Sequence, residues 1–236
     1  MYLSIIVPAF NEEDYIMECL ESLRAQTITR FELIVVDNNS TDKTSEIAVN
    51  YTDNLLFESK QGYHNAVKCG IENATGDLVT VCDADSLYES DWVETIYRVF
   101  GANTIGIYGS VNFHDGHLIY RTLIRFFCFT IFMRLMRIIG IDVCNGFNFV
   151  FRKDAYLKVG GYDPQIFDNV GLDIHLGRRL KQLGRLRFVP ALKVRTSMRR
   201  ISERGLWHFI SVNLAMYWAF IRGKEGSTSY DEYNVR

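Results

Sequence analysis

A short apolar run that stops at two carboxylates constrains this chain more than any other feature. Residues 78–82 (Leu-Val-Thr-Val-Cys) are strand formers that follow the turn residues 75–77 and lead directly into Asp83-Ala84-Asp85. Residues two apart in a strand face the same side, so these carboxylates repel each other unless a cation lies between them. A divalent cation that prefers oxygen ligands, Mg²⁺ or Mn²⁺, would satisfy both. By itself such a pair is more often a loop or a helix cap, so the rest of the chain has to decide.

Composition and charge narrow the class of protein. The 236 residues are 48% hydrophobic and 23% charged, which is typical of one large globular domain, and the net charge of −2 gives no case for nucleic-acid binding. Five scattered cysteines, an odd number, favour a reducing compartment over a disulfide framework. The first residues enter a strand without a basic segment before it, so we expect no signal peptide and a cytoplasmic location.

Strand and helix patterns alternate through the first half of the chain. Apolar runs at 3–7, 31–36, 54–57, 78–82 and 104–109 predict strands, and the stretches between them predict helices. This alternation predicts an α/β fold with a mostly parallel central sheet and helices on both faces. Neither a dinucleotide fingerprint nor a P-loop follows the first strand.

Several local features give sharper expectations. Asn11 is expected to cap the first helix, and Pro190 to end a short last strand over 187–189. Residues 145–152 are expected to form a strand, and 172–183 a helix that stops at Gly184.

Two apolar, aromatic helices stand apart from the rest. Residues 118–141 contain Arg121, Arg125, Arg134 and Arg137, which leave only 126–133 uncharged, too short for a membrane span of ~20 residues. This helix either packs on the domain or lies in a membrane interface, and the sequence leaves both open. Residues 205–221 predict a second such helix, rich in Trp, Phe and Tyr, before a polar tail.

Several ordered motifs resemble those of a known family. They are Ser4 to Glu13 (Ser-Ile-Ile-Val-Pro-Ala-Phe-Asn-Glu-Glu), Val35 to Asp42, Gly62 to Asp77, Asp83 to Asp85, Asn145 to Asp163, and Asp173 with the following Arg178-Arg179-Leu180 and Gly184. Together, over about residues 3–200, they are similar to the inverting family 2 glycosyltransferases of the GT-A fold. The resemblance implies a GT-A domain over 1–200, with a nucleotide-sugar half at about 1–110 and an acceptor half at about 111–200. The C-terminal helix and tail would occupy 201–236.

The resemblance also implies roles for individual residues. Asp85 would hold Mg²⁺ or Mn²⁺ between the donor's phosphates, Asp83 would share that metal or contact the ribose, and Asp173 would be the catalytic base. The implied donor-binding residues are Pro8, Ala9, Asn11, Glu12, Asp37, Gly62, Asn65, Asp83, Ala84, Asp85, Arg199 and Arg200. For Asp37, capping of the next helix is nearly as good an explanation, and the basic turn 195–200 is equally well read as a solvated loop.

One departure from the family's pattern concerns the acceptor. Leu172 stands where the family usually has a glutamate before the base, so the acceptor is less defined than the donor chemistry. The tryptophan-containing signature of processive synthases is also missing, which favours transfer of a single sugar. We expect a UDP-sugar donor, with GDP-mannose next, and a hydroxyl or phosphate acceptor on a glycan, a lipid or a protein. A lipid-linked acceptor would suit peripheral contact with the cytoplasmic face of a membrane.

Three other classes of protein account for parts of the sequence. An aspartyl-phosphate hydrolase would leave the 8–11 segment and Asp173 unexplained. A nucleotidyltransferase on the same fold normally opens with a glycine-rich basic loop, which this chain lacks, and a non-catalytic nucleotide-sugar-binding protein would make the separated carboxylates a coincidence. The last two remain the alternatives to a glycosyltransferase.

Overall fold

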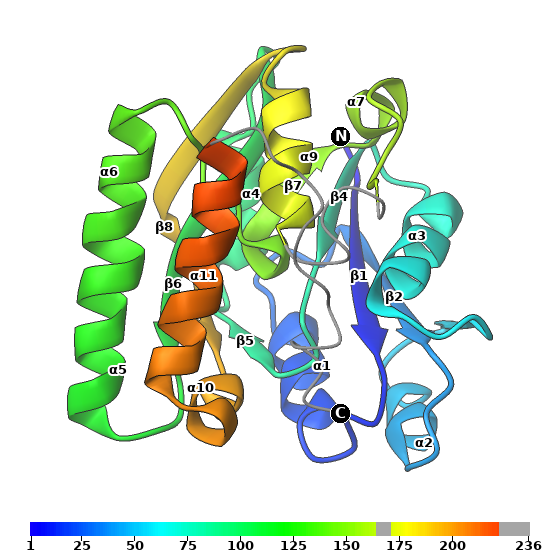
Figure 1. Cartoon of the computed structure of the whole chain (residues 1–236). Helices are drawn as coiled ribbons and strands as arrows, with labels where there is room; N and C mark the ends of the chain where they lie inside the picture. The colour runs from blue at the N-terminus through cyan, green and yellow to red at the C-terminus, as the bar shows by residue number, and fades with distance from the viewer. Residues whose placement is uncertain (164–170, 222–236) are drawn as a thin grey trace.

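A single eight-stranded sheet runs through the computed structural model, which describes residues 1–163 and 171–221 (Figure 1). The strands are β1 (Leu3–Ala9), β2 (Phe31–Asp37), β3 (Asn54–Phe57), β4 (Leu78–Val81), β5 (Ser86–Tyr88), β6 (Thr104–Phe113), β7 (Phe149–Arg152) and β8 (Arg185–Thr196). Their order across the sheet is β3-β2-β1-β4-β7-β6-β8-β5. The helices are α1 (Ile16–Arg24), α2 (Thr44–Ala48), α3 (Tyr63–Asn73), α4 (Trp92–Val99), α5 (Leu118–Ile124), η1 (Arg125–Phe132), α6 (Met133–Ile138), η2 (Gly146–Asn148), α7 (Lys153–Lys158), α9 (Leu172–Leu180), α10 (Arg199–Arg204) and α11 (Leu206–Ile221).

The strands from the first half of the chain pair in parallel. β1 pairs with β2 and β4, and β2 pairs with β3, all in parallel, while β7 joins β4 and β6 in antiparallel fashion. The expected mostly parallel α/β sheet is therefore confirmed. Because parallel strands end at the same edge, this topology brings the ends of β1, β2 and β4 together.

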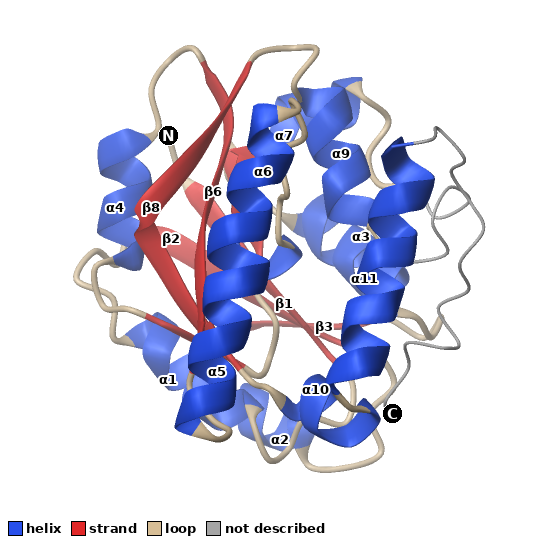
Figure 2. Ribbon diagram, turned by 60° about the vertical axis from the view of Figure 1, so that its left-hand side comes forward, coloured by secondary structure: helices blue, strands red, loops and turns tan. Residues whose placement is uncertain are grey.

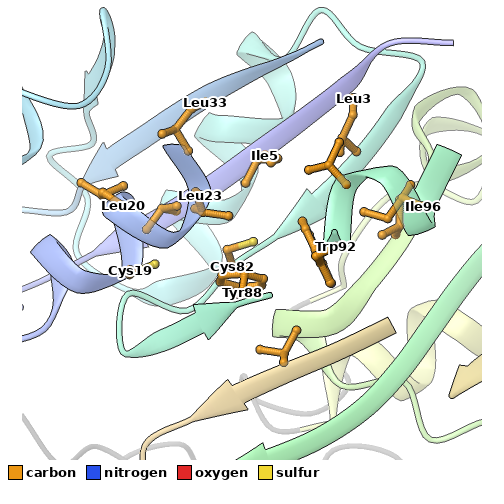
Figure 3. Packing of buried hydrophobic residues seen from close by; sticks show 14 of the residues in the cluster. Leu3, Ile5, Cys19, Leu20, Leu23, Leu33, Cys82, Tyr88, Trp92 and Ile96 are labelled. Carbon is orange, nitrogen blue, oxygen red and sulfur yellow. The ribbon is translucent and has the colours of Figure 1, made fainter. Parts of the chain in front are cut away.

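Both faces of the sheet are covered. On one face, α1 and α4 pack over β1, β2 and β4. Figure 3 shows this cluster, in which Leu20, Leu23, Trp92 and Ile96 surround Leu3, Ile5 and Leu33. On the other face, α3, α7, α9 and α6 contribute apolar side chains to a second cluster. All seven residues of β1 are buried, because this strand lies in the interior of the sheet between β2 and β4 and is covered on both faces.

Three local expectations were wrong. Asn11 does not cap a helix: α1 begins at Ile16, and Asn11 lies in a turn with φ of 51°. β8 does not end at Pro190 but continues to Thr196, because its register against β6 shifts between Gly109 and Ser110. Proline is tolerated at such an irregularity, where no ladder hydrogen bond is lost. The stretch 145–152 becomes a strand only at Phe149, after the short turn η2.

The segment 118–138 forms one continuous helical rod of α5, η1 and α6, which is a π-helix in its middle. In Figures 1 and 2 the rod lies at one side of the sheet with α11 beside it. None of the described helices has the length and apolar composition needed to cross a bilayer.

Candidate active site

The turn after β1 and the loop after β2 are joined by hydrogen bonds. The Asn11 side-chain oxygen accepts a hydrogen bond from the Thr41 amide at 2.8 Å, and the Asn11 amide donates to the Ser40 hydroxyl at 3.0 Å. Asp37, buried at the end of β2, accepts from the Ser40 amide at 3.0 Å and from the Ser45 hydroxyl. Asp37 therefore organises the loop that leads into α2, but it does not cap that helix, whose first residue is preceded by Lys43 and which has no side-chain cap hydrogen bond. Pro8 and Ala9 lie at the end of β1, and Ala9 pairs with Asp37 in the sheet register.

Asn38 connects this loop to the start of α3. Its amide group donates to the carbonyls of Glu58 and Lys60 at 2.8 and 2.9 Å, and its oxygen accepts from the Gly62 amide at 2.7 Å. Gly62 has φ of +130°, a conformation that other residues rarely adopt. Asn65 follows in the first turn of α3 and donates to the carbonyl of Gln61. The predicted donor residues Gly62 and Asn65 thus lie in a loop that Asn38 ties to β2.

The two carboxylates after β4 have different surroundings. Asp83 is partly buried and accepts a hydrogen bond from the Tyr63 hydroxyl at 3.3 Å. Asp85 is only 6% exposed, and its carboxylate lies 2.8 Å from Nε of Arg199. Ala84 between them is buried.

Arg199 also binds a second carboxylate. Its two terminal nitrogens each lie 2.7 Å from an oxygen of Glu12, a fully buried residue in the turn after β1. Its guanidinium carbon lies 4.6 Å from the centre of the Tyr15 ring. Arg199 therefore links the first turn of the chain to the Asp-Ala-Asp motif.

The residues before Arg199 are held by two residues that follow β6. Asp115 accepts hydrogen bonds from the Ser197 hydroxyl at 2.5 Å and the Met198 amide at 2.6 Å. His114, next to it, lies 3.0 Å from the backbone carbonyl of Asp85. These contacts fix the start of α10 beside the motif, and neither His114 nor Asp115 was predicted from the sequence.

Asp173 lies in the first turn of α9. It accepts a hydrogen bond from the Tyr162 hydroxyl at 2.8 Å and another from the Gly146 backbone. A Cβ atom on Gly146 would lie 2.4 Å from the carboxylate, so only glycine allows this approach. Burial, reinforced by the negative charge of Asp83, raises the pKa of Asp173 from 3.8 to about 6. Leu172 is buried and adds no charge to this carboxylate.

The structure thus gathers the predicted site residues around the carboxyl ends of β1, β2 and β4 and the starts of α3, α9 and α10. The side chain of Arg200 lies outside the described residues. Asn38, Tyr63 and Tyr162 lie within the motifs of the resemblance, but no role was predicted for them from the sequence. Gly146 was noted only within a motif, and its contact with Asp173 has no local signal.

Carboxylates able to hold a cation are few. Among residues 1–163 and 171–221, no cluster of three or more His, Cys, Asp or Glu side chains has a metal-binding arrangement. Asp83 and Asp85 remain as possible oxygen ligands of a cation, and Asp85 already pairs with the positive charge of Arg199. One or two carboxylates fit a Mg²⁺ or Mn²⁺ ion whose other ligands come from substrate phosphates and water.

Sequence comparisons identify relatives of the chain. Glycosyltransferase AglE of Haloferax volcanii is 28% identical over 195 residues, covering 78% of this chain and 62% of the relative. GlyG of Streptococcus pneumoniae is 32% identical over 136 residues, covering 53% of this chain and 45% of the relative. The chain therefore spans less than two thirds of the length of either relative.

Solved structures share the fold. The mannosyltransferase PcManGT of Pyrobaculum calidifontis, in complex with GDP-Man and Mn²⁺, superposes with a TM-score of 0.67 at 20% identity, covering 87% of this chain and 59% of that one. The glucosyl-3-phosphoglycerate synthase of Mycobacterium tuberculosis, in complex with Mn²⁺, UDP and phosphoglyceric acid, gives 0.60 at 19% identity, covering 86% and 72%. At these identities the likeness shows the fold alone. The model of glycosyl transferase family 2 matches residues 4–160, and with the ordered motifs and the shared fold this places the chain in that family.

Proposed function

We propose that this protein transfers one sugar from a nucleotide-diphosphate sugar, first of all a UDP-sugar, to an acceptor hydroxyl with inversion at the anomeric carbon. The observation that carries this proposal is Asp173, a carboxylate held by Tyr162 and Gly146 near Asp83, with a pKa raised to about 6. A general base works best when its pKa lies near the working pH. Asp173 meets this condition, since it is ionised at neutral pH and still basic enough to accept a proton.

The reaction would be a single displacement. The acceptor oxygen attacks the anomeric carbon and loses its proton to Asp173, while the bond to the nucleoside diphosphate breaks and its electrons leave with the diphosphate. A base is needed for a hydroxyl acceptor but not for a phosphate that is already ionised. Asp173 therefore favours the hydroxyl among the acceptors expected from the sequence.

Asp85, with Asp83, would hold Mg²⁺ or Mn²⁺ together with the donor's phosphates. Bound there, the ion would act as a Lewis acid that neutralises charge on the departing diphosphate. Complexes of PcManGT with GDP-Man and Mn²⁺ and of the mycobacterial synthase with UDP and Mn²⁺ support this use of a divalent ion.

The rest of the donor would lie along the loops after β1 and β2. A carboxylate has about four acceptor positions, so Asp37 can bind Ser40 and Ser45 and still accept a hydrogen bond from the donor's ribose or base. Asn38 holds the loop that carries Gly62 and Asn65 against this site.

Release of nucleoside diphosphate tests the proposal. The protein is incubated with UDP- and GDP-sugars, Mn²⁺ and a mixture of glycan, lipid-linked and protein acceptors. Diphosphate released together with a labelled sugar on one acceptor is the expected result. Release of pyrophosphate in a parallel incubation with UTP or GTP and a sugar 1-phosphate, and of no diphosphate from the nucleotide sugars, would indicate a nucleotidyltransferase. Binding of nucleotide sugar without release of either product would indicate a non-catalytic binding protein. Either outcome contradicts the proposal.

The surface of the helical rod α5–η1–α6 is relevant to the kind of acceptor and to where in the cell the protein works. Its inner side packs on the domain through Ile124, Met133 and Met136. Its outer side exposes further large apolar residues, among them Ile119, Phe127, Leu135 and Ile138, the last 79% exposed. Helix α11 lies beside the rod (Figure 2). On α11, Trp207 is 82% exposed and Trp218 is 56% exposed. A helix that is apolar on both sides needs a partner on its outer side.

The charge of the rod supports one kind of partner over another. Residues 116–141 contain four arginines and no acidic residue, in a chain whose net charge is −2. Arg125 and Arg134 are exposed, so their charges are available to a partner. A second copy of the chain would bring arginines against arginines across a two-fold axis, whereas anionic lipid headgroups over an apolar interior complement both features. Peripheral binding to the anionic cytoplasmic face of a membrane, with a lipid-linked acceptor, is therefore part of the proposal.

Co-sedimentation with vesicles tests this part. We expect binding to vesicles that contain phosphatidylserine or phosphatidylglycerol, weaker binding at high salt, and several-fold weaker binding of the Arg125→Gln/Arg134→Gln variant. The matched control is Arg24→Gln/Arg185→Gln, which removes two exposed arginines elsewhere and should bind like the unaltered protein. Protein that stays in the supernatant with anionic vesicles at low salt would contradict membrane binding, and concentration-dependent dimers without lipid would assign the surface to a second copy.

A further inference from the structure

The guanidinium group of Arg199 lies between two carboxylates that come from opposite ends of the chain. Its terminal nitrogens lie 2.7 Å from the two oxygens of Glu12, and its Nε lies 2.8 Å from Asp85. Glu12 is fully buried, Asp85 is 6% exposed, and the Arg199 side chain is 16% exposed. All three nitrogens of the guanidinium group therefore bind carboxylates, two on one side and one on the other.

The Glu12 side of this arrangement is the firmer one. A carboxylate that binds both terminal nitrogens matches the fork geometry of arginine, and charge-assisted pairs of this kind are strong. The Tyr15 ring packs against the guanidinium group, and the Glu12 amide donates to the Thr44 hydroxyl at 2.8 Å. Asp115 fixes the backbone on the other side of Arg199 through Ser197 and Met198. Arg199 would stay in place if its single contact with Asp85 were lost.

The Asp85 contact is the one that a divalent ion would compete for. If Asp85 holds the ion that accompanies the donor, its oxygen cannot at the same time bind Nε of Arg199 at 2.8 Å, because the two positive charges repel at that range. The released Nε would then face the negative diphosphate.

Resting on the function proposed above, we propose that Arg199 exchanges partners during donor binding. In the empty site it neutralises Asp85 and keeps a lone divalent ion from binding tightly. When donor and ion arrive together, Asp85 turns to the ion, and Arg199 turns its freed N–H to the diphosphate while Glu12 keeps hold of its other two nitrogens. Glu12 is therefore a positioning residue, which acts on the diphosphate only through Arg199.

The exchange predicts changes of opposite sign in two affinities. Arg199→Gln removes the competitor for Asp85, so Mn²⁺ alone should bind more tightly, roughly tenfold or more, the scale on which one adjacent charge changes the proton affinity of a carboxylate. The same variant loses its N–H contact with the diphosphate, so UDP in the presence of Mn²⁺ should bind more weakly. A purely structural role for Arg199 would leave both affinities unchanged or lower both.

Isothermal titration calorimetry on the whole chain measures both affinities without any turnover. Mn²⁺ is titrated into the protein alone, and UDP into the protein with Mn²⁺, for the unaltered chain, Arg199→Gln and the control Arg24→Gln, in which an exposed arginine at the end of α1 is lost. Thermal unfolding checks that each variant folds. Should Arg199→Gln fail to fold, Arg199→Lys keeps the charge but cannot bridge both carboxylates, and should shift the two affinities in the same directions by less.

Glu12→Gln supplies an independent arm. It keeps the shape of the side chain but removes the charge that draws Arg199 away from Asp85, so Mn²⁺ alone should bind more weakly, the reverse of Arg199→Gln. Since Glu12 acts through Arg199, the Glu12→Gln substitution should change Mn²⁺ binding less when Arg199→Gln is already present than when it is made alone. Unchanged or weakened Mn²⁺ binding by Arg199→Gln, or by Arg199→Lys in its place, would overturn the exchange. If UDP bound to none of the proteins, the unaltered chain included, the result would instead count against the proposed function. The titration with Mn²⁺ alone distinguishes failure of the exchange from failure of the proposed function.

Discussion

Two regions of the molecule differ in where their side chains find contacts: the loops at the ends of β1, β2 and β4, and the rod α5–η1–α6. In the loops, polar groups find partners within the protein: Asp37 binds Ser40 and Ser45, and Glu12 binds Arg199. Along the rod, large apolar side chains remain on the outer surface, as Ile138 does. Buried polar groups are costly unless they are paired, and exposed apolar surface is retained where something else covers it. The first region is therefore built to hold fixed groups, and the second is built to meet a partner.

The largest effect is expected at the base. Asp173→Asn keeps the shape of the side chain but cannot accept a proton at neutral pH. We expect turnover to fall roughly 10²-fold or more, the usual range for a positioned general base, with UDP affinity nearly unchanged. Steady-state kinetics and titration of UDP give the two values. Near-normal turnover would mean that another group is the base and that the polar network serves only to bind donor.

The pH profile examines the same group without a substitution. Burial and the charge of Asp83 raise the pKa of Asp173 to about 6, and only the ionised carboxylate can accept the proton. The value of kcat/KM, which reports the groups of the free enzyme, should therefore be constant well above this pKa and fall about tenfold for each pH unit below it. A profile that stays flat down to the ordinary aspartate pKa of about 4 would contradict the raised value.

A third effect tests how closely the acceptor side is fitted to the base. In Gly146→Ala the added Cβ would lie 2.4 Å from the Asp173 carboxylate, so that group or its loop must move. Because a misplacement of about 1 Å can cost up to 10²-fold in rate, we expect a fall in kcat of roughly tenfold with little change in UDP affinity. The control is Gly101→Ala, whose new Cβ would meet only Thr104 at the ordinary distance of 3.8 Å. Equal kcat values for the two variants would mean that Gly146 does not position the base.

The same contrast explains what could be predicted from sequence. The alternation of apolar runs gave the parallel half of the sheet because burial and local propensity agree there, as the fully buried β1 illustrates. The Glu12–Arg199 pair could not be found in this way, since its partners are 187 residues apart and neither position has a local signal for the other. The length of β8 was underestimated because a proline such as Pro190 normally ends a strand. Only the pairing of β8 with β6 reveals the irregularity that accommodates this proline. The contact of Gly146 with Asp173 likewise depends on tertiary packing.

A fourth prediction concerns the stability of the polar region. Asn38→Ala removes three hydrogen bonds to the loop before α3 from a residue that is 3% exposed. Leaving those backbone groups without a partner should lower the free energy of unfolding by about 1–3 kcal/mol and weaken UDP binding, as denaturant titration and calorimetry would show. In the control Asn50→Ala, the exposed side chain loses contacts with Glu46 and Ile47, and the change should stay within about 0.5 kcal/mol. Similar losses for both variants would mean that the loop gains no special support from Asn38.

The smallest effect on stability is expected on the rod. Ile138→Ser changes a side chain that is 79% exposed, so the free energy of unfolding should change by no more than about 0.5 kcal/mol. The comparison variant is Ile34→Ser, in which the altered residue of β2 is only 2% exposed. Its free energy of unfolding should fall by at least the roughly 2–5 kcal/mol typical of truncating a buried isoleucine. Binding to anionic vesicles should respond in the opposite order, because Ile138 would enter the lipid and Ile34 is enclosed by the core. Denaturant titration and co-sedimentation under conditions where both variants are folded give the two rankings. A large loss of stability in Ile138→Ser without lipid would mean that the outer side of the rod is already covered in solution, and that a second copy of the chain, rather than a membrane, occupies it.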